Sequence, residues 1–437
     1  MLCLADVFQD HMVLQRHKPI AVFGTSETPG TVTLAGQSVA FTPLADGRFL
    51  CYLPAMPAGG PHTLTVTAGS ESVSRTDVLI GEVYIAGGQS NMQLHVEDTV
   101  DIQPVDRPQL RYFREPHYYR EDRTAGCDEP CWQPFTKEQM PGFSAVGSSF
   151  ALHLADELPV PIGIVSCNTG ASRVDAWTAP EITQTPEYQR LVSEPHPDYE
   201  NYRFNQDNWL YWHKLLPIVP YTAAGVLWYQ GESNRGRAEA PYYDQLLAKM
   251  IENWRALWQE ELPFYLVQLM PYADGVACAD LASIRLAQER ASRQIPHTAM
   301  VTLVETGESH EIHPTHKDTV GHALANAVLH WQFGRTELEY SGPICTACRR
   351  EENGAQLIFS HADGLHFAGG KAEDIQVIDR GGAAHAPTAA VIEGNTLHLR
   401  WEAAVDVAGI DIGYRNAPQH TLYNAAGYLA SPVHWLF

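Results

Sequence analysis

The sequence predicts an α/β fold: a doubly wound parallel sheet flanked by a small β domain at each end. Unbroken apolar runs, which are typical of parallel strands covered on both faces, carry most of this prediction. Amphipathic stretches at helical spacing separate the runs, and strand, helix, strand in succession gives right-handed crossovers. The length of 437 residues suits about three domains at roughly 150 residues each. The runs lie at 83–86, 163–166, 225–228, 264–267 and 300–304.

Residues 1–80 are predicted to form a β-sandwich-like domain. Short alternating runs at 20–24, 32–34, 49–52 and 63–66 are broken by turn residues. Strands of this length and spacing are typical of a small β-sandwich.

The central domain, the one with the α/β pattern, is predicted to span residues 81–340. Apolar residues recur at helical spacing in stretches that begin at Phe150, Leu246 and Val320. Beyond residue 340 the helical pattern stops and short β runs return. Residues 341–437 are therefore predicted to form a second β domain.

Charge and hydropathy exclude two classes of partner. The chain has 51 acidic and 29 basic residues, a formal charge of −22, which is the wrong sign for binding phosphates, so no nucleic acid partner is expected. No apolar run approaches the roughly 20 residues that cross a bilayer, so no membrane association is expected either. The first residues do not read as an export signal, which predicts a cytoplasmic protein, or a secreted or periplasmic one if a leader was removed.

The eight cysteines do not form a metal or disulfide framework. Cys345 and Cys348 form a CxxC pair and Cys127 and Cys131 a CxxxC pair, but no second Cys or His pair follows at zinc-finger spacing. We expect free thiols. The alternatives are a structural zinc ion or, in a secreted protein, a clip. No metal and no other cofactor is expected.

Polar residues follow four of the apolar runs, where ligands bind in an open parallel sheet. Ser90 follows the first run, Gly170 the second and Gln230 the third, and His313 follows the last, before Pro314, which suits the first turn of a helix. A hydroxyl, a backbone donor, an amide and an imidazole are the parts of a serine esterase. A helix N-terminus after His313 would disfavour its imidazolium form. Singly, each residue also fits a turn, a solvated loop or a cap.

Three motifs stand at a specific separation: GGQSNM at 87–92, YQGESN at 229–234, and IHP at 312–314 followed by Lys317. Together they resemble the sialate O-acetylesterase family of the SGNH hydrolase superfamily. Further segments of this chain resemble the family over nearly its whole length, at 10–16, 175–177, 422–424 and 430–432. The resemblance implies an SGNH-type three-layer α/β/α catalytic domain with accessory β domains, and a metal-independent carbohydrate acetylesterase.

The resemblance also implies a role for each motif residue. Ser90 would be the nucleophile and His313 the general base. The oxyanion would be held by the backbone N–H groups of Ser90 and Gly170 and by the side chain of Gln230. Glu311, two residues before the histidine, would orient the imidazole; a Ser/His dyad, with a backbone carbonyl in that place, is the alternative.

Substrate binding rests on three further candidates. Arg173, beside the oxyanion loop, would pair with a substrate carboxylate such as that of sialic acid, or is a surface arginine. Trp177 and Tyr229 are candidate sugar platforms, although aromatic residues also build cores. We expect an acetylated carbohydrate substrate, first O-acetylated sialic acid and second acetylated xylan or mannan; a carbohydrate-binding protein without catalysis is the alternative outside enzymes.

Overall fold

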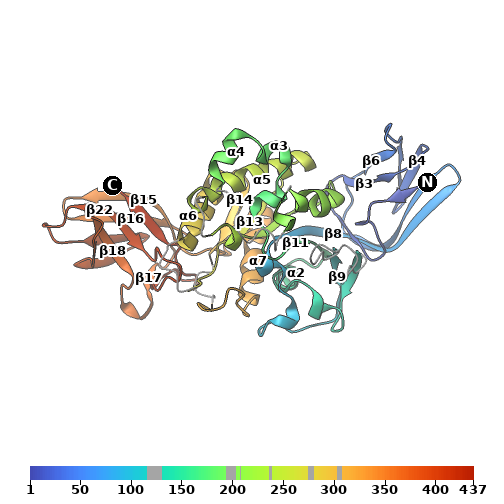
Figure 1. The fold of residues 1–437 in the computed structure, drawn as a ribbon. Coiled ribbons are helices and arrows are strands. Elements are labelled where there is room, and N and C mark those ends of the chain that lie inside the picture. Colours follow the sequence, from blue (N-terminus) through green and yellow to red (C-terminus); the bar gives the residue numbers. More distant parts are fainter. Residues whose placement is uncertain (116–129, 193–202, 207, 236–238, 274–279, 303–307) are drawn as a thin grey trace. The chain divides into compact units, whose positions relative to one another are not determined.

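The structure, a computed structural model, describes residues 1–115, 130–192, 203–206, 208–235, 239–273, 280–302 and 308–437. The chain divides into two compact units (Figure 1), and each is described by itself. The first unit comprises Met1–Tyr188, Glu194–Gln230 and Lys249–Phe264, and the second comprises Gln189–Ser193, Gly231–Ala248 and Tyr265–Phe437. The predicted boundaries at residues 80 and 340 stay predictions.

The first unit begins with short strands that cover the four predicted β runs. Three of these strands form a separate antiparallel sheet in the order β1-β3-β6. The others join the long strand β8, β2 in parallel and β7 in antiparallel orientation, with β4 and β5 beyond β7. The strands are β1 (Cys3–Leu4), β2 (Val13–Gln15), β3 (Ile20–Thr25), β4 (Gly30–Leu34), β5 (Gln37–Phe41), β6 (Arg48–Leu53), β7 (Gly59–Ala68) and β8 (Glu71–Gly88).

Strand β8 changes its environment along its length. Residues 71–77 alternate between exposed and half-buried positions, whereas residues 78–88 are all buried. The first part pairs with β7, and the second part runs between two parallel neighbours, β11 (Ile162–Asn168) and β12 (Gly225–Tyr229). The strand is therefore much longer than the predicted run at 83–86.

The sheet of the first unit has the strand order β10-β9-β11-β8-β12. The predicted parallel pairing is confirmed for β11, β8 and β12. Strand β9 (Arg107–Arg114), which was not predicted, is also parallel to β11, but β10 (Cys131–Phe135) is antiparallel to β9, so the sheet is mixed. After β8 the chain forms β9, β10 and β11 on one side of β8, and it later forms β12 on the other side. In open α/β sheets, ligands bind beyond the carboxyl ends of the strands at such a reversal, which here lies at β8 and β12.

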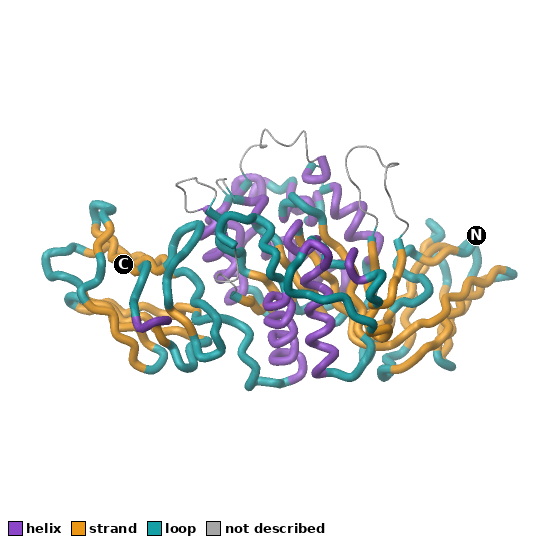
Figure 2. The backbone as a smooth tube through the Cα atoms, turned by 90° about the horizontal axis from the view of Figure 1, so that it is seen from below, coloured by secondary structure: helices purple, strands orange, loops and turns teal. Residues whose placement is uncertain are grey.

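Helices follow the strands of the first unit (Figure 2). The predicted helix at Phe150 is α2 (Ala145–Glu157), which packs against β9 and β11. Ser144 caps it, because its hydroxyl accepts a hydrogen bond from the Gly147 N–H at 3.0 Å. Part of α5 (Tyr243–Trp258) also belongs to this unit. The short helices are α1 (Ser90–Gln93), α3 (Pro180–Thr183), α4 (Pro186–Leu191), η1 (Val96–Asp98), η2 (Met140–Gly142), η3 (Val174–Trp177), η5 (Arg203–Asn205), η6 (Tyr211–Leu215) and η7 (Leu216–Ile218).

The second unit continues the α/β pattern. Helices α6 (Asp280–Gln294) and α7 (Asp318–Phe333) pack against β14 (Thr298–Val301), whose Val301 carbonyl accepts from Gln268, just after β13 (Phe264–Val267). The predicted helix through Val320 is α7. However, α7 begins four residues after Pro314, so the predicted place of this proline in its first turn is wrong. The short helices are η8 (Glu232–Asn234) and η9 (Ala240–Tyr242).

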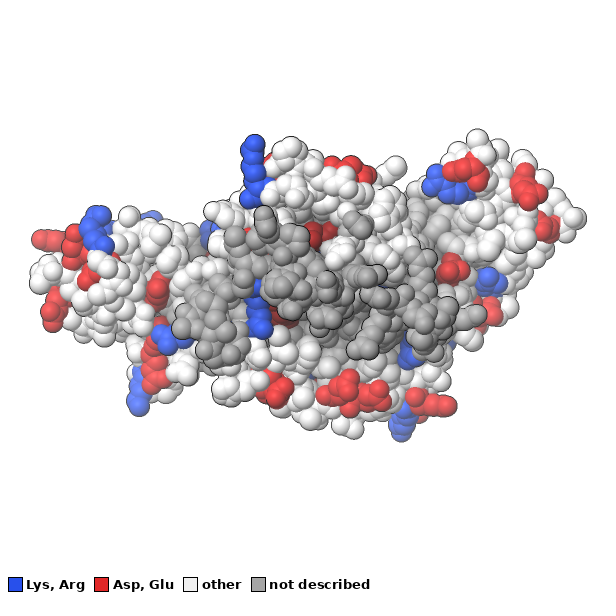
Figure 3. Space-filling view, viewed as in Figure 1, with Lys and Arg blue, Asp and Glu red and all other residues white. Residues whose placement is uncertain are grey.

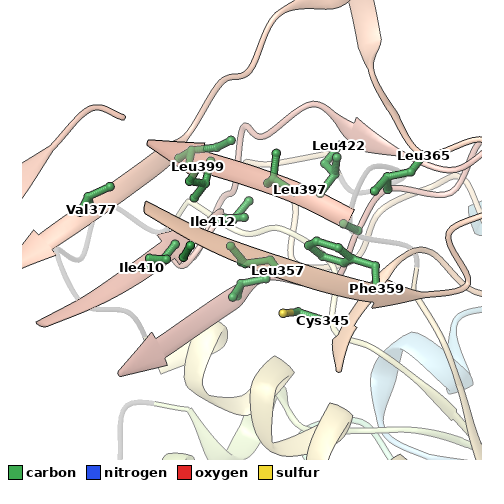
Figure 4. Close-up of a cluster of buried hydrophobic side chains, with 14 of the residues drawn as sticks. Cys345, Leu357, Phe359, Leu365, Val377, Leu397, Leu399, Ile410, Ile412 and Leu422 are labelled. Carbon is green, nitrogen blue, oxygen red and sulfur yellow. The ribbon is translucent and has the colours of Figure 1, made fainter. Parts of the chain in front are cut away.

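The β runs predicted beyond residue 340 are present. Two four-stranded antiparallel sheets, β15-β16-β21-β20 and β19-β18-β22-β24, enclose their own apolar core (Figure 4). The elements are β15 (Ile344–Glu351), β16 (Gly354–Ser360), β17 (His366–Phe367), η10 (Ala368–Gly370), β18 (Ile375–Asp379), β19 (Ala384–His385), β20 (Ala389–Glu393), β21 (Thr396–Arg400), β22 (Val407–Ile412), β23 (Leu422–Tyr423) and β24 (Val433–Leu436).

Cysteines take ordinary places in the part of the chain that the structure describes. Cys345 lies in the C-terminal core, where burial raises the pKa of its thiol, and neither it nor Cys348 forms a disulfide. Cys131 is half-buried in β10, while Cys127 lies outside the described residues. Among the described helices, none is both long and apolar enough to cross a membrane.

Candidate active site

Ser90 stands at the end of β8, where the chain turns sharply into α1. Gly88 has φ +134°, and a Cβ at this position would stand 2.1 Å from the carbonyl oxygen of Tyr229, so the turn requires glycine. The Gln89 N–H then donates to the same carbonyl at 3.0 Å. As a result the chain leaves the sheet at once, and Ser90 is only half-buried. Its hydroxyl is therefore placed beyond the carboxyl end of a buried strand.

Gly170 lies directly beside Ser90. It follows β11, and a Cβ added to it would come within 3.4 Å of the Ser90 Cβ. Its backbone N–H donates to Oε1 of Gln93 at 2.6 Å. The structure thus brings together the predicted nucleophile and the predicted backbone donor, and it shows that the donor is engaged by a side chain.

Gln230 follows β12 and is fully buried. Its Nε2 donates to Oε1 of Gln89 at 3.1 Å and to the Ser172 carbonyl at 3.0 Å. A primary amide has two N–H donors, so these two bonds use both of them. In this structure Gln230 fastens the segments that follow β8 and β11 to the end of β12.

Trp177 and Tyr229 are core residues. Trp177 is fully buried, its Nε1 donates to the Ser172 hydroxyl at 3.0 Å, and its ring packs against Trp228 and Trp254 with centroids 6.2 and 6.5 Å away. Tyr229 is fully buried within β12. A sugar platform needs an exposed ring face. The predicted platform role is therefore wrong for both residues in this structure.

Arg173 is buried, with 1% of its surface exposed, so the alternative of a surface arginine is wrong. Its Nε lies 3.1 Å from Oδ1 of Asp175, and its backbone N–H donates to Asn205 at 2.8 Å. The charge of the guanidinium is therefore matched within the protein. A substrate carboxylate would have to compete with Asp175 for it.

A buried lysine–glutamate pair that the sequence analysis missed supports the turn that carries Gly170. Nζ of Lys214 donates to the carbonyl of Asn168, the last residue of β11, at 2.8 Å and lies 3.6 Å from Oε2 of Glu115. Burial raises the pKa of Glu115 to about 8, although Lys214 opposes the rise. Glu115 and Lys214 lie far apart in the sequence, and no sequence motif identifies them as partners.

His313 and Glu311 lie in the second unit, in the loop that precedes α7. Burial lowers the pKa of His313, although the residue is exposed overall; the Lys317 ammonium lowers it further, and the Glu311 carboxylate opposes both effects. The structure thus places Glu311 close enough to act on the imidazole electrostatically.

Glu308 anchors this loop, and the sequence analysis missed it. Its Oε1 accepts from the Thr315 N–H at 3.0 Å and the Thr315 hydroxyl at 2.7 Å, and lies 3.2 Å from Nδ1 of His316. The hydrogen bonds from Thr315 lower the pKa of Glu308. The acidic residue five positions before His313 was the available signal. The prediction considered only the positions two and three before it.

A half-buried serine beyond a buried parallel strand, beside a glycine turn, is an arrangement that an α/β ester hydrolase requires, and comparison with known proteins shows that the chain belongs to this class. Residues 80–330 match the model of one protein family, described as carbohydrate esterase, sialic acid-specific acetylesterase. The chain belongs to this family and is a carboxylic ester hydrolase. The resemblance drawn from the three motifs is confirmed.

Similar proteins extend the match beyond the catalytic region. Human sialate O-acetylesterase is 26% identical over 386 residues, which cover 78% of this chain and 73% of the human protein. The mouse sialate O-acetylesterase is 25% identical over 412 residues, with 78% and 75% covered. The crystal structure of a carbohydrate acetylesterase from Xanthomonas citri has a TM-score of 0.87 and 30% identity, and the match covers 99% of each chain.

Proposed function

We propose that this protein is a serine esterase of the SGNH type that removes O-acetyl groups from carbohydrates through an acetyl-Ser90 intermediate. The observation that carries the proposal is the position of Ser90, half-buried beyond β8 and so near Gly170 that a Cβ added to this glycine would lie 3.4 Å from the Ser90 Cβ. A nucleophile needs both access to the ester and a donor for the developing oxyanion.

In the proposed reaction the Ser90 hydroxyl attacks the acetyl carbonyl while His313 accepts its proton. The C–O bond to the sugar breaks, His313 returns the proton to the sugar oxygen, and water then hydrolyses the acetyl-serine to acetate in the same manner. A general base must be neutral before it acts, and the lowered pKa of His313 supports this role. Glu311 would orient the imidazole, with the Ser/His dyad as the alternative.

The oxyanion would be held by the N–H groups of Ser90 and Gly170, with Gln230 as the third donor. Gln230 can serve only if one of its N–H groups turns away from Gln89 or Ser172. We expect Gln230→Ala to lower kcat by roughly 10²-fold if it makes this turn. A variant that is less stable but turns over at the normal rate would assign Gln230 to the scaffold alone.

For the sugar, O-acetylated sialic acid is the first candidate, in line with the sialate O-acetylesterases that this chain resembles. A neutral acetylated polysaccharide such as xylan is the second, and one observation favours it. Arg173, the cation expected to bind the sialate carboxylate, is buried against Asp175. On the face of the molecule drawn in Figure 3, basic side chains of the described residues are scattered among acidic ones and form no single patch.

The nucleophile is tested by Ser90→Ala with an aryl acetate as substrate. We expect turnover to fall to background and the wild-type protein, but not the variant, to gain one phosphonyl group when treated with an aryl phosphonate. Ser74 is an exposed serine on β8, the strand that leads to Ser90. As the control, Ser74→Ala should leave both the turnover and the phosphonylation unchanged. Turnover retained by Ser90→Ala would refute the assignment.

The sugar is tested by acetate release from O-acetylated sialic acid and from acetylated xylan under the same conditions. A higher kcat/KM for sialate supports the first candidate, and a higher kcat/KM for xylan supports the second. Activity on aryl acetates with neither sugar would contradict both.

A further inference from the structure

We propose that the side chain of Gln93 occupies the oxyanion hole of the resting enzyme and that the acetyl group of the substrate must displace it. This inference rests on the proposed function, because it takes Gly170 as an oxyanion donor to the Ser90 reaction. It adds a residue that competes with the substrate at the reacting centre.

The contact itself is well defined. Gln93 ends α1, three residues after Ser90, so both side chains lie on one face of the helical turn. Its Oε1 stands 2.6 Å from the Gly170 nitrogen, at the short end of the range for an N–H···O bond. The backbone N–H can only donate, so the carbonyl end of the Gln93 amide must face it.

The atom that Gly170 binds resembles the atom it is expected to bind during the reaction. The Gln93 Oε1 is an sp² carbonyl oxygen, as is the oxygen of an acetyl ester. A Cβ added to Gly170 would meet this Oε1 at 3.0 Å and the Ser90 Cβ at 3.4 Å, so both residues lie on the side of Gly170 where a side chain would stand. An ester attacked by Ser90 would present its oxygen in the space that Gln93 now fills.

The contact between Gln93 and Gly170 is less buried than the structural hydrogen bonds of Gln230. Gln93, Ser90 and Gly170 are all half-buried, whereas Gln230, which links the strand ends, is fully buried. Withdrawal of the Gln93 side chain from Gly170 would leave the buried bonds of Gln230 in place, and Gly170 could then exchange one oxygen acceptor for another. The cost of the exchange falls on binding, because Gln93 leaves before the ester carbonyl enters.

A neutral hydrogen bond of ordinary net strength corresponds to a factor of roughly 5 in binding. Gln93→Met keeps the length of the side chain but removes the acceptor. We expect it to lower the KM for an aryl acetate roughly 5-fold with kcat unchanged, and to accelerate inactivation by an aryl phosphonate by a similar factor. Gln93→Glu, whose carboxylate is a stronger acceptor, should raise KM by more than 5-fold at neutral pH.

Gln184→Met, at an exposed position after α3, is the matched control and should change neither constant. An unchanged or higher KM in Gln93→Met, or a lower kcat, would overturn the inference, because Gln93 would then be inert or would assist the reaction. If Gln93→Met does not fold, Gln93→Glu decides the matter: a raised KM supports the inference and an unchanged KM overturns it. Activity retained by Ser90→Ala would instead refute the proposed function, whatever the Gln93 variants do.

Discussion

Glu115→Gln tests whether the buried pair behind β11 makes the stability of the protein depend on pH. Burial raises the pKa of Glu115 from its ordinary value of 4.5 to about 8. The folded state therefore binds a proton more tightly than the unfolded state between these two pH values. It follows that the free energy of unfolding decreases as the pH rises through this window, and is highest below it.

The size of the effect follows from the two pKa values. At about 1.4 kcal/mol for each pH unit between 4.5 and about 8, the loss approaches about 5 kcal/mol above pH 8. Glutamine has the same shape and no charge. The Glu115→Gln variant should therefore lose less stability than the wild type on going from pH 5 to pH 9, by a few kcal/mol.

Urea unfolding at pH 5, 7 and 9 measures this difference, and titrating groups that do not interact with Glu115 cancel between the two proteins. Glu157→Gln, an exposed carboxylate at the end of α2, is the matched control and should follow the wild type at each pH. The reasoning fails if Glu115→Gln and the wild type lose the same stability between pH 5 and pH 9.

Three further substitutions probe other parts of the structure. Arg285→Met should lower the free energy of unfolding by about 3–5 kcal/mol, because this buried guanidinium donates to four backbone carbonyls. Lys317→Met should move the acid limb of the kcat/KM profile to higher pH, because the Lys317 ammonium lowers the pKa of His313. Gly88→Ala should lower the free energy of unfolding, and with it the thermal midpoint. The loss should exceed the about 1–3 kcal/mol that backbone strain alone would cost, because the added Cβ would also collide with the Tyr229 carbonyl.

The first two of these predictions have a control variant, and each of the three has an outcome that would contradict it. Arg290→Met, on the same helix as Arg285 but 38% exposed in its side chain, should cost less than about 1 kcal/mol; an equal loss in both variants would contradict the first prediction. Lys249→Met, on an exposed lysine side chain, should leave the pH profile in place, and a shift in this variant alone would contradict the second. A wild-type thermal midpoint in Gly88→Ala would contradict the third.

The buried strands could be predicted from the sequence because a strand that is buried on both faces consists almost entirely of apolar residues. Strands β8, β11 and β12 each contain a predicted apolar run. Strand β9 was missed because Arg107–Arg114 mixes charged residues and a proline with its apolar positions, and β10 pairs with it by hydrogen bonds that any side chain permits. The antiparallel strand that makes the sheet mixed could therefore not be predicted from the sequence.

The site was predictable only where position follows from topology. Ser90 and Gly170 both follow adjacent parallel strands, so the rule that carboxyl ends meet at one edge placed them together. Side-chain orientation does not follow from this rule. The contact of Gln93 with Gly170 depends on the turn at Gly88, and the burial of Trp177 depends on a helix that arrives from much later in the chain.

The charge of the chain bears on the substrate through Arg173. A formal charge of −22 opposes the approach of an anionic sugar, so sialate binding requires a local cation at the site. Arg173 was the candidate, and its pairing with Asp175 removes most of its attraction for a second carboxylate. Asp175→Asn distinguishes the two sugars: the freed guanidinium should increase kcat/KM for O-acetylated sialate and leave that for acetylated xylan unchanged. An equal change for both sugars would mean that Arg173 serves the fold and that specificity lies elsewhere.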